Sequence, residues 1–142
     1  MAQPQQPGDE TIEPELLALA RRVQSNAHVP YSGFRVGAAL RTVSGAVFSG
    51  CNVENAAYPE GLCAEASAIA AMASAGERVI DVILTVCDGD ELGTSCGGCR
   101  QKIREFATED TLIHNAGSGG VLATFTMDEI LPASFGPHHL LG

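Results

Sequence analysis

The sequence predicts a protein of the α/β class, in which a five-stranded mixed sheet is covered by helices. Segments with helical spacing of apolar residues alternate with short apolar strands, in the order α-β-β-α-β-α-β-β-α, and no part of this order repeats. The 142 residues suffice for one domain, and 45% of them are apolar, which is enough to build a hydrophobic core.

The three longer helices are predicted from apolar spacing and from residues that begin or end helices. The first is expected over residues 12–27, with Thr11 as its cap, because apolar residues recur there near helical spacing. The second is expected over residues 62–75 and stops at Gly76, a residue type that favours the backbone conformation after a helix. The third is expected over residues 97–106.

Five short segments rich in apolar and β-branched residues are predicted as strands: 36–42, 46–51, 81–87, 111–115 and 121–126. The first two form a hairpin that turns at Ser44 and Gly45. The third is a continuous apolar run, which is typical of a strand buried on both faces. After the last strand, Thr126 and Glu129 form a capping box for a short helix that Pro132 ends.

The composition limits the classes of partner. The net charge of −9 repels phosphate backbones, so we expect no nucleic-acid partner, whereas a small neutral ligand is unaffected. No apolar run reaches the roughly 18 residues that a membrane-spanning helix needs. The N-terminus lacks the basic flank and apolar core of a signal peptide, so we expect a cytoplasmic protein without a membrane partner. Residues 1–10, rich in Gln and Pro, are expected to form a disordered tail before one domain over residues 11–142.

The cysteines indicate a metal site. Five cysteines are an odd number in a chain expected to stay in a reducing compartment, which favours metal or reactive-thiol chemistry over disulfides. Cys96 and Cys99 have the short spacing of a zinc knuckle or of a redox pair, and Cys63 also begins a predicted helix. Three thiolates leave one tetrahedral position of a zinc ion free, as in catalytic sites. Cys51 or Cys87 as a fourth ligand would instead make a structural site, although Cys87 has the pattern of a core residue.

Glu65 follows Cys63 by two positions in the predicted second helix. A glutamate in the first turn of a helix complements the helix dipole, and that role alone would explain it. Beside an open zinc position, the same carboxylate can take a proton from zinc-bound water and pass it to a leaving group. A purely structural zinc site has no need of it.

Four segments carry a resemblance to a known family: PYSGFRVGAAL (30–40), GCNVENAAYPEGLCAE (50–65), CGGCRQKIREF (96–106) and LPASFGP (131–137). They are collinear and resemble the small, single-domain, homotetrameric cytidine deaminases, and the resemblance extends over residues 16–140. It implies a three-layer α/β/α fold and a catalytic domain over residues 11–142 that holds one zinc per chain. It also implies hydrolysis of free cytidine and deoxycytidine to uridine, deoxyuridine and ammonia, a reaction of pyrimidine salvage.

The resemblance also assigns roles to individual residues. The matching zinc ligands are Cys63, Cys96 and Cys99, and Glu65 matches the general acid and base. The substrate-binding positions are Phe34, which packs on the base, Asn52 and Glu54, which bind the ribose hydroxyls, and Ala64 and Thr94, whose backbones face the pyrimidine. The residues that approach a neighbouring subunit's site are Tyr58 and Phe135.

Two positions depart from the family pattern. Ser95 stands where proline usually precedes the first cysteine of the CxxC, and Ala66 stands where arginine usually follows the catalytic glutamate and donates to the thiolates. Arg35 or Arg100 are alternative sources of that missing cation. Three other functions remain open from the sequence: a deaminase of a modified or antibiotic aminopyrimidine nucleoside, a non-catalytic zinc protein and a CxxC redox protein.

Overall fold

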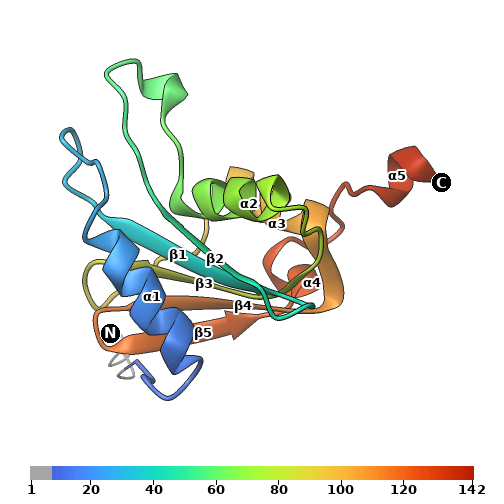
Figure 1. The fold of residues 1–142 in the computed structure, drawn as a ribbon, viewed down its shortest axis with the longest axis horizontal. Coiled ribbons are helices and arrows are strands. Elements are labelled where there is room, and N and C mark those ends of the chain that lie inside the picture. Colours follow the sequence, from blue (N-terminus) through green and yellow to red (C-terminus); the bar gives the residue numbers. More distant parts are fainter. Residues whose placement is uncertain (1–7) are drawn as a thin grey trace, which may run out of the picture.

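A five-stranded mixed sheet with the strand order β2-β1-β3-β4-β5 forms the middle of the molecule (Figure 1). Its strands are β1 (Val36–Thr42), β2 (Val47–Cys51), β3 (Ile80–Cys87), β4 (Ala107–Gly117) and β5 (Gly120–Phe125). The pair β3–β4 is parallel and the other three pairs are antiparallel. The predicted five-stranded mixed sheet is therefore confirmed. The computed structural model describes residues 8–142.

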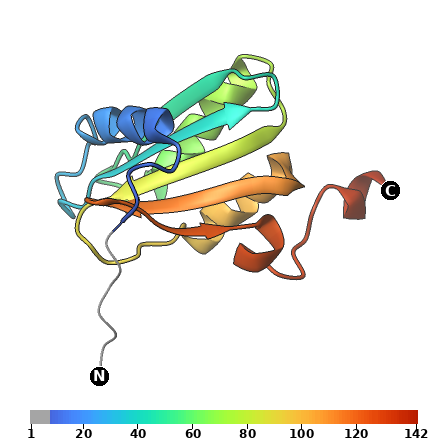
Figure 2. The ribbon, with the colours of Figure 1, turned by 90° about the horizontal axis from the view of Figure 1, so that it is seen from below.

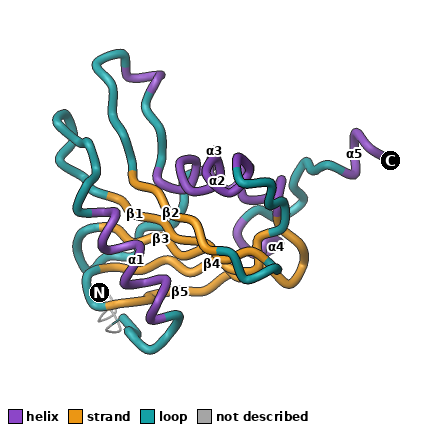
Figure 3. The backbone as a smooth tube through the Cα atoms, viewed as in Figure 1, coloured by secondary structure: helices purple, strands orange, loops and turns teal. Residues whose placement is uncertain are grey.

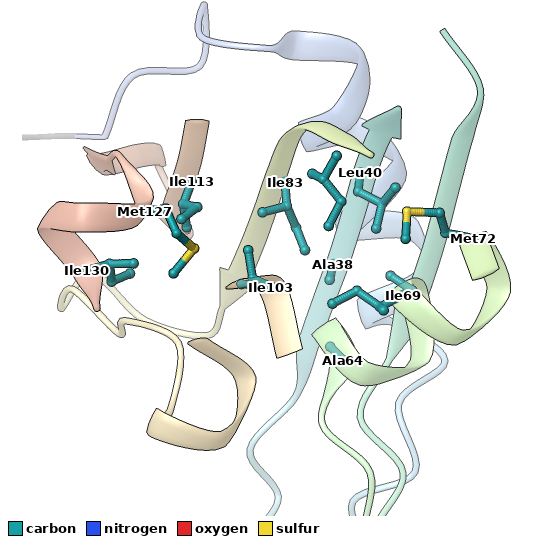
Figure 4. Close-up of a cluster of buried hydrophobic side chains, with 12 residues drawn as sticks. Ala38, Leu40, Ala64, Ile69, Met72, Ile83, Ile103, Ile113, Met127 and Ile130 are labelled. Atoms are coloured by element: carbon teal, nitrogen blue, oxygen red, sulfur yellow. The ribbon is translucent and has the colours of Figure 1, made fainter. Parts of the chain in front are cut away.

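Helices cover both faces of the sheet, as the three-layer α/β/α prediction requires (Figures 1 and 2). On one face, α1 (Pro14–Gln24) packs against the strands in a cluster that contains Leu16, Leu17, Ala39 and Leu84. On the other face lie α2 (Ala64–Ser74), α3 (Gly97–Phe106) and the short α4 (Met127–Ile130). Figure 4 shows their apolar side chains meeting those of the central strands.

The alternation of side chains along the central strands explains the two cores. Ile83 belongs to the cluster under α2 and α3, and its neighbour Leu84 belongs to the cluster under α1. Both side chains are fully buried. The continuous apolar run in β3 is therefore buried on both faces, as predicted.

A close approach of α2 to β2 fixes the position of the helix. A Cβ atom added to Gly50 would lie 2.5 Å from the Ser67 Cβ and 2.6 Å from the Ala68 amide nitrogen. Only glycine leaves room for this contact, so α2 sits directly on the edge strand of the sheet. The N-terminus of α2, which carries Cys63 and Glu65, is positioned by the same contact.

The predicted Thr11 cap of α1 is wrong. The helix begins at Pro14, and Glu13 precedes it with a φ of 46° and without a side-chain cap hydrogen bond. Thr11 instead donates from its backbone N–H and its hydroxyl to the Asp9 carboxylate, at 2.8 and 2.6 Å. Proline has the φ that a first helical residue needs and no N–H to satisfy, so the helix starts without a hydroxyl cap. The helix also ends at Gln24, short of the predicted residue 27.

Strand β4 begins at Ala107, directly after α3, and not at residue 111 as predicted. Its pairing with β3 is irregular after Ala107. There the Thr111 hydroxyl donates to the Ile80 carbonyl at 2.7 Å and accepts from the Thr108 N–H at 2.9 Å. The polar residues of this irregular stretch lack the apolar alternation that predicts a strand.

The local signals at the turns are confirmed. Gly45 and Gly76 both have a φ of +91°, in the hairpin turn and after α2. Thr126 and Glu129 form a reciprocal capping box at α4. The expected disordered tail falls mainly on residues 1–7, which lie outside the described range, and Asp9 pairs with Val121 beside β5.

Long loops project from the ends of the sheet (Figure 3). The loops that follow α1 and β2 rise together from one end and are joined by a bridge between His28 and Val53. The loop after β2 contains a short 3₁₀ helix, η1 (Tyr58–Glu60), and the C-terminal segment ends in α5 (His138–Leu141), away from the sheet (Figure 1). Within residues 8–142 there is no helix of the length and apolarity needed to cross a membrane.

Candidate active site

Two helix N-termini on one face of the sheet carry the three predicted metal ligands. Cys63 is the residue before α2, and an antiparallel bridge between Val53 and Leu62 fixes the chain that leads into it. Cys96 is the residue before α3, and Cys99 lies in the first turn of that helix. The positive ends of both helix dipoles therefore meet the cysteines, which favours thiolates.

The three sulfur atoms form a compact group. They all lie within 4.8 Å of one another, and the Sγ atoms of Cys63 and Cys96 are 3.9 Å apart. Sulfurs bound to one tetrahedral zinc, each about 2.3 Å from it, are about 3.8 Å apart, so the residues fit this metal. The group contains neither Cys51 nor Cys87, and Cys87 is buried, as its core pattern predicts. A set of three cysteines leaves one zinc position open for a non-protein ligand.

A metal ion that binds here must displace protons from the cysteine thiols. Burial raises the pKa of the Cys63 thiol and raises the pKa of the Cys99 thiol still more strongly. Burial acts in the same direction at Cys96, but hydrogen bonds from Cys99 and Cys63 outweigh it and lower the pKa of that thiol. Without a cation, the Cys63 and Cys99 thiols therefore stay protonated at neutral pH.

A cavity of about 420 Å³ opens beside the sulfur group. Its walls contain most of the predicted site residues: Phe34, Asn52, Glu54, Tyr58, Cys63, Ala64, Glu65, Thr94 and Cys96. Cys99 is completely buried beside Cys96. Phe135 does not line this cavity and is 56% exposed on the C-terminal segment. The fold thus brings every predicted site residue except Phe135 together around one cavity.

The cavity also has walls that the sequence interpretation missed. Thr85 and Cys87 contribute from the end of β3, and Val36 contributes from the start of β1. The period of two in β3 contained the signal, because positions 85 and 87 share the face of Ile83. Ser95 lines the cavity as well, and its hydroxyl is buried without a hydrogen-bond partner among residues 8–142.

Glu65 is 4% exposed in the first turn of α2, and it lines the cavity together with Cys63. No residue in the described part of the chain forms an ion pair with its carboxylate. A buried carboxylate at a cavity wall, without a fixed cation, is free to exchange protons with a molecule in the cavity. The helix dipole favours a negative charge at this position, which explains how it is tolerated there.

Asn52 and Glu54 hold the wall that carries Phe34. The Asn52 side chain accepts from the Val36 N–H and donates to the Phe34 carbonyl, both at 2.9 Å. The Glu54 carboxylate accepts from the Ser32 hydroxyl and N–H and from the Tyr31 N–H, and its pKa is lowered mainly by the Ser32 hydroxyl. Phe34 is 48% exposed at the cavity and is not a core residue.

Comparisons with known proteins agree with this geometry. Residues 11–115 match the family described as the cytidine and deoxycytidylate deaminase zinc-binding region. The chain is 35% identical to the cytidine deaminase of Sporosarcina psychrophila over 89% of its own length and 93% of that protein. It is 38% identical to the cytidine deaminase of Halalkalibacterium halodurans, with 84% and 91% covered. The crystal structure of cytidine deaminase from Burkholderia pseudomallei matches with a TM-score of 0.81 at 34% identity, covering 88% of this chain and 100% of the other.

Proposed function

The chain belongs to the family of zinc-dependent cytidine and deoxycytidylate deaminases, and we propose that it hydrolyses free cytidine and deoxycytidine. The products are uridine or deoxyuridine and ammonia, as pyrimidine salvage requires. We assign the catalysis to residues 11–142 and the location of the protein to the cytoplasm.

One observation carries this proposal: the three-sulfur group and the Glu65 carboxylate share one cavity. A structural zinc site needs no cavity and no unpaired carboxylate beside the metal. A redox pair needs only two cysteines, so the third sulfur within 4.8 Å also favours metal chemistry.

The proposed chemistry divides between the metal and Glu65. Zinc held by Cys63, Cys96 and Cys99 supplies a water molecule made acidic near neutral pH. Glu65 accepts a proton from the attacking water and gives it to ring N3 of the base. It then takes the second proton from the hydroxyl that has added at C4 and gives it to the amine, which leaves as ammonia while the C4 carbonyl of the product forms.

The remaining walls bind the nucleoside. We assign Phe34 to packing on the base, and the backbones of Ala64 and Thr94 to the edge of the pyrimidine. We assign Asn52 and Glu54 to the ribose hydroxyls. Their hydrogen bonds to the backbone leave acceptor capacity on the Glu54 oxygens and one donor on the Asn52 amide.

The charge of the cavity favours a nucleoside over a nucleotide. Its described walls contain the carboxylates of Glu54 and Glu65 and no lysine, arginine or histidine. A 5′-phosphate would meet negative charge there without a cation to pair with it. This supports free cytidine as the substrate rather than its monophosphate.

We further propose that the protein is a homotetramer in which Tyr58 and Phe135 approach a neighbouring subunit's cavity. Both side chains are exposed in the single chain, at 75% and 56%. Apolar surface of this kind is stabilised when a second copy covers it.

The test is ammonia release by the zinc-loaded protein with cytidine, deoxycytidine, deoxycytidine monophosphate, 5-methylcytidine and blasticidin S. We expect turnover of the first two and at least about tenfold lower kcat/KM for the monophosphate, since an unpaired charge at a site costs more than about 1.4 kcal/mol. Turnover confined to the modified base or the antibiotic would transfer the function to that substrate. A zinc-loaded protein inactive on all five would contradict the proposal.

A further inference from the structure

Arg100 follows the ligand Cys99 directly and is half-buried in the first turn of α3. Its guanidinium donates three hydrogen bonds. The Nε atom donates to the Ser95 carbonyl at 2.7 Å and the Nη2 atom to the Thr94 hydroxyl at 2.8 Å. The Nη1 atom donates to the Ile130 carbonyl at 2.8 Å. The planar fork of arginine suits this arrangement, because it presents several donors in fixed directions.

These contacts fix a segment that otherwise has little support. Residues 90–95 form neither helix nor strand and lead into the ligand Cys96. All the hydrogen bonds that the described structure gives to residues 90–95 come from Arg100. The Ser95 hydroxyl is buried without a partner in that same part of the chain, so it does not hold the segment.

The third hydrogen bond anchors Arg100 itself. Ile130 is 3% exposed and belongs to the apolar cluster beneath α3 and α4. A guanidinium tied to this carbonyl is held in place by the core of the molecule. It can therefore transmit that rigidity to Thr94 and Ser95, whose residues line the cavity.

We propose that Arg100 is a positioning residue that sets the cavity wall at Thr94 and Ser95 and the approach of Cys96 to the metal. Its hydrogen bonds go to none of the sulfur atoms and it does not line the cavity, so it acts through the two residues that do line it. The part that concerns substrate binding rests on the proposed function, whereas the part that concerns zinc does not.

The experiment compares Arg100→Met, Arg100→Lys and Thr94→Val with the unchanged protein. Lys102→Met is the control, because it removes one positive charge from the same helix at an exposed position that does not line the cavity. Three quantities are measured on folded, zinc-loaded protein: hydrogen exchange over residues 90–96, the rate of zinc loss to a chelator, and KM and kcat for cytidine.

We expect Arg100→Met to speed hydrogen exchange over residues 90–96 and to raise the rate of zinc loss by at least about tenfold, the low end for residues that support metal ligands. KM should rise by about tenfold or more, with a smaller change in kcat. Arg100→Lys should resemble Arg100→Met, since lysine keeps the charge but not the fork. Thr94→Val removes one hydrogen bond and should raise KM by a few-fold, and Lys102→Met should change nothing.

Two outcomes would overturn the proposal. Full recovery of all three quantities in Arg100→Lys would show that only the charge matters. Unchanged exchange over residues 90–96 in a folded Arg100→Met protein would show that the segment does not depend on the guanidinium. If the unchanged protein lacks deaminase activity but the variants still alter exchange and zinc loss, the proposed function fails and the role of Arg100 stands.

Discussion

At the scale of single residues, Glu65 has a common structural role and a chemical one. A first-turn glutamate stabilises a helix by interacting with its dipole, and this effect requires neither burial nor a cavity. Glu65 is almost fully buried and lines the cavity next to Cys63. Burying a carboxylate costs free energy, which a merely helix-stabilising residue at the surface avoids.

Replacing Glu65 with glutamine separates the two roles. The substitution Glu65→Gln preserves shape and removes the proton acceptor, so the protein should keep about one zinc while kcat falls at least about 100-fold. Elemental analysis and ammonia release measure both quantities. Glu60→Gln makes the same change outside the cavity, in η1, and should leave kcat within about twofold, as surface substitutions do. A Glu65→Gln enzyme with most of its activity would show that Glu65 only stabilises the helix.

Single residues also show where prediction from sequence stopped. The three cysteines and Glu65 were predicted from short motifs that fix their types and spacing. The family resemblance supplied other cavity-lining residues, but not Val36, Thr85 or Cys87. The hydrogen bonds of Asn52 to the Val36 and Phe34 backbone were not predicted, nor were those of Arg100 to Ser95 and Ile130. Each joins residues distant along the chain or a side chain to a backbone atom, and no local pattern specifies such a partner.

At the scale of elements, hydrophobic periodicity was sufficient where an element buries one face or both. It predicted α1 and all five strands, whereas α2 was predicted from an alanine-rich run that stops at Gly76. It placed the start of α1 wrongly, because Pro14 starts the helix without a hydroxyl cap, and it missed the polar beginning of β4. It also gave no signal for η1 and α5, which are too short and too exposed to show a period.

The burial of the sulfur group has a consequence for zinc binding. Burial raises the pKa of the Cys63 and Cys99 thiols, so both carry protons at pH 7 in the metal-free protein, whereas the pKa of Cys96 is lowered. Zinc binds thiolates and must displace these protons. We therefore expect the uptake of one zinc to release at least about two protons at pH 7, and the affinity for zinc to rise with pH.

Calorimetry of zinc binding in buffers with different ionisation enthalpies counts the released protons. Cys99→Ser should lower the zinc affinity and reduce the number of released protons by about one. Cys51→Ser is the control, since Cys51 lies outside the sulfur group and should change neither quantity. Zinc uptake without proton release would mean that the thiols are already ionised before the metal arrives.

At the scale of the whole molecule, the projecting segments, which are the loops after α1 and β2 and the C-terminal segment, expose large apolar side chains to solvent. The loops around Tyr31 and Tyr58 lie at one end of the sheet, and their rings meet edge to face with centroids 5.7 Å apart. On the C-terminal segment, Leu140 and Leu141 are 79% and 85% exposed, and Phe135 stacks on His139. Because a separate chain gains little from these side chains, they favour a self-association surface.

We expect the protein in solution to be a homotetramer of roughly four times 14.7 kDa. Phe135→Ala removes an exposed ring from the C-terminal segment. It should shift the tetramer toward smaller species and lower kcat/KM by about tenfold or more, because truncating an aromatic anchor at an interface typically costs about 2 kcal/mol or more. The unfolding midpoint of the separate chain should change little, because the ring is 56% exposed and belongs to neither core cluster of residues 8–142. Light scattering over a range of concentrations, with activity measured on the same samples, gives both quantities.

Val43→Ala is the control, since Val43 is 66% exposed in the β1–β2 turn and lies outside the projecting segments. A monomer with full activity at every concentration would refute the tetramer and, with it, any role of Phe135 beside a neighbouring cavity.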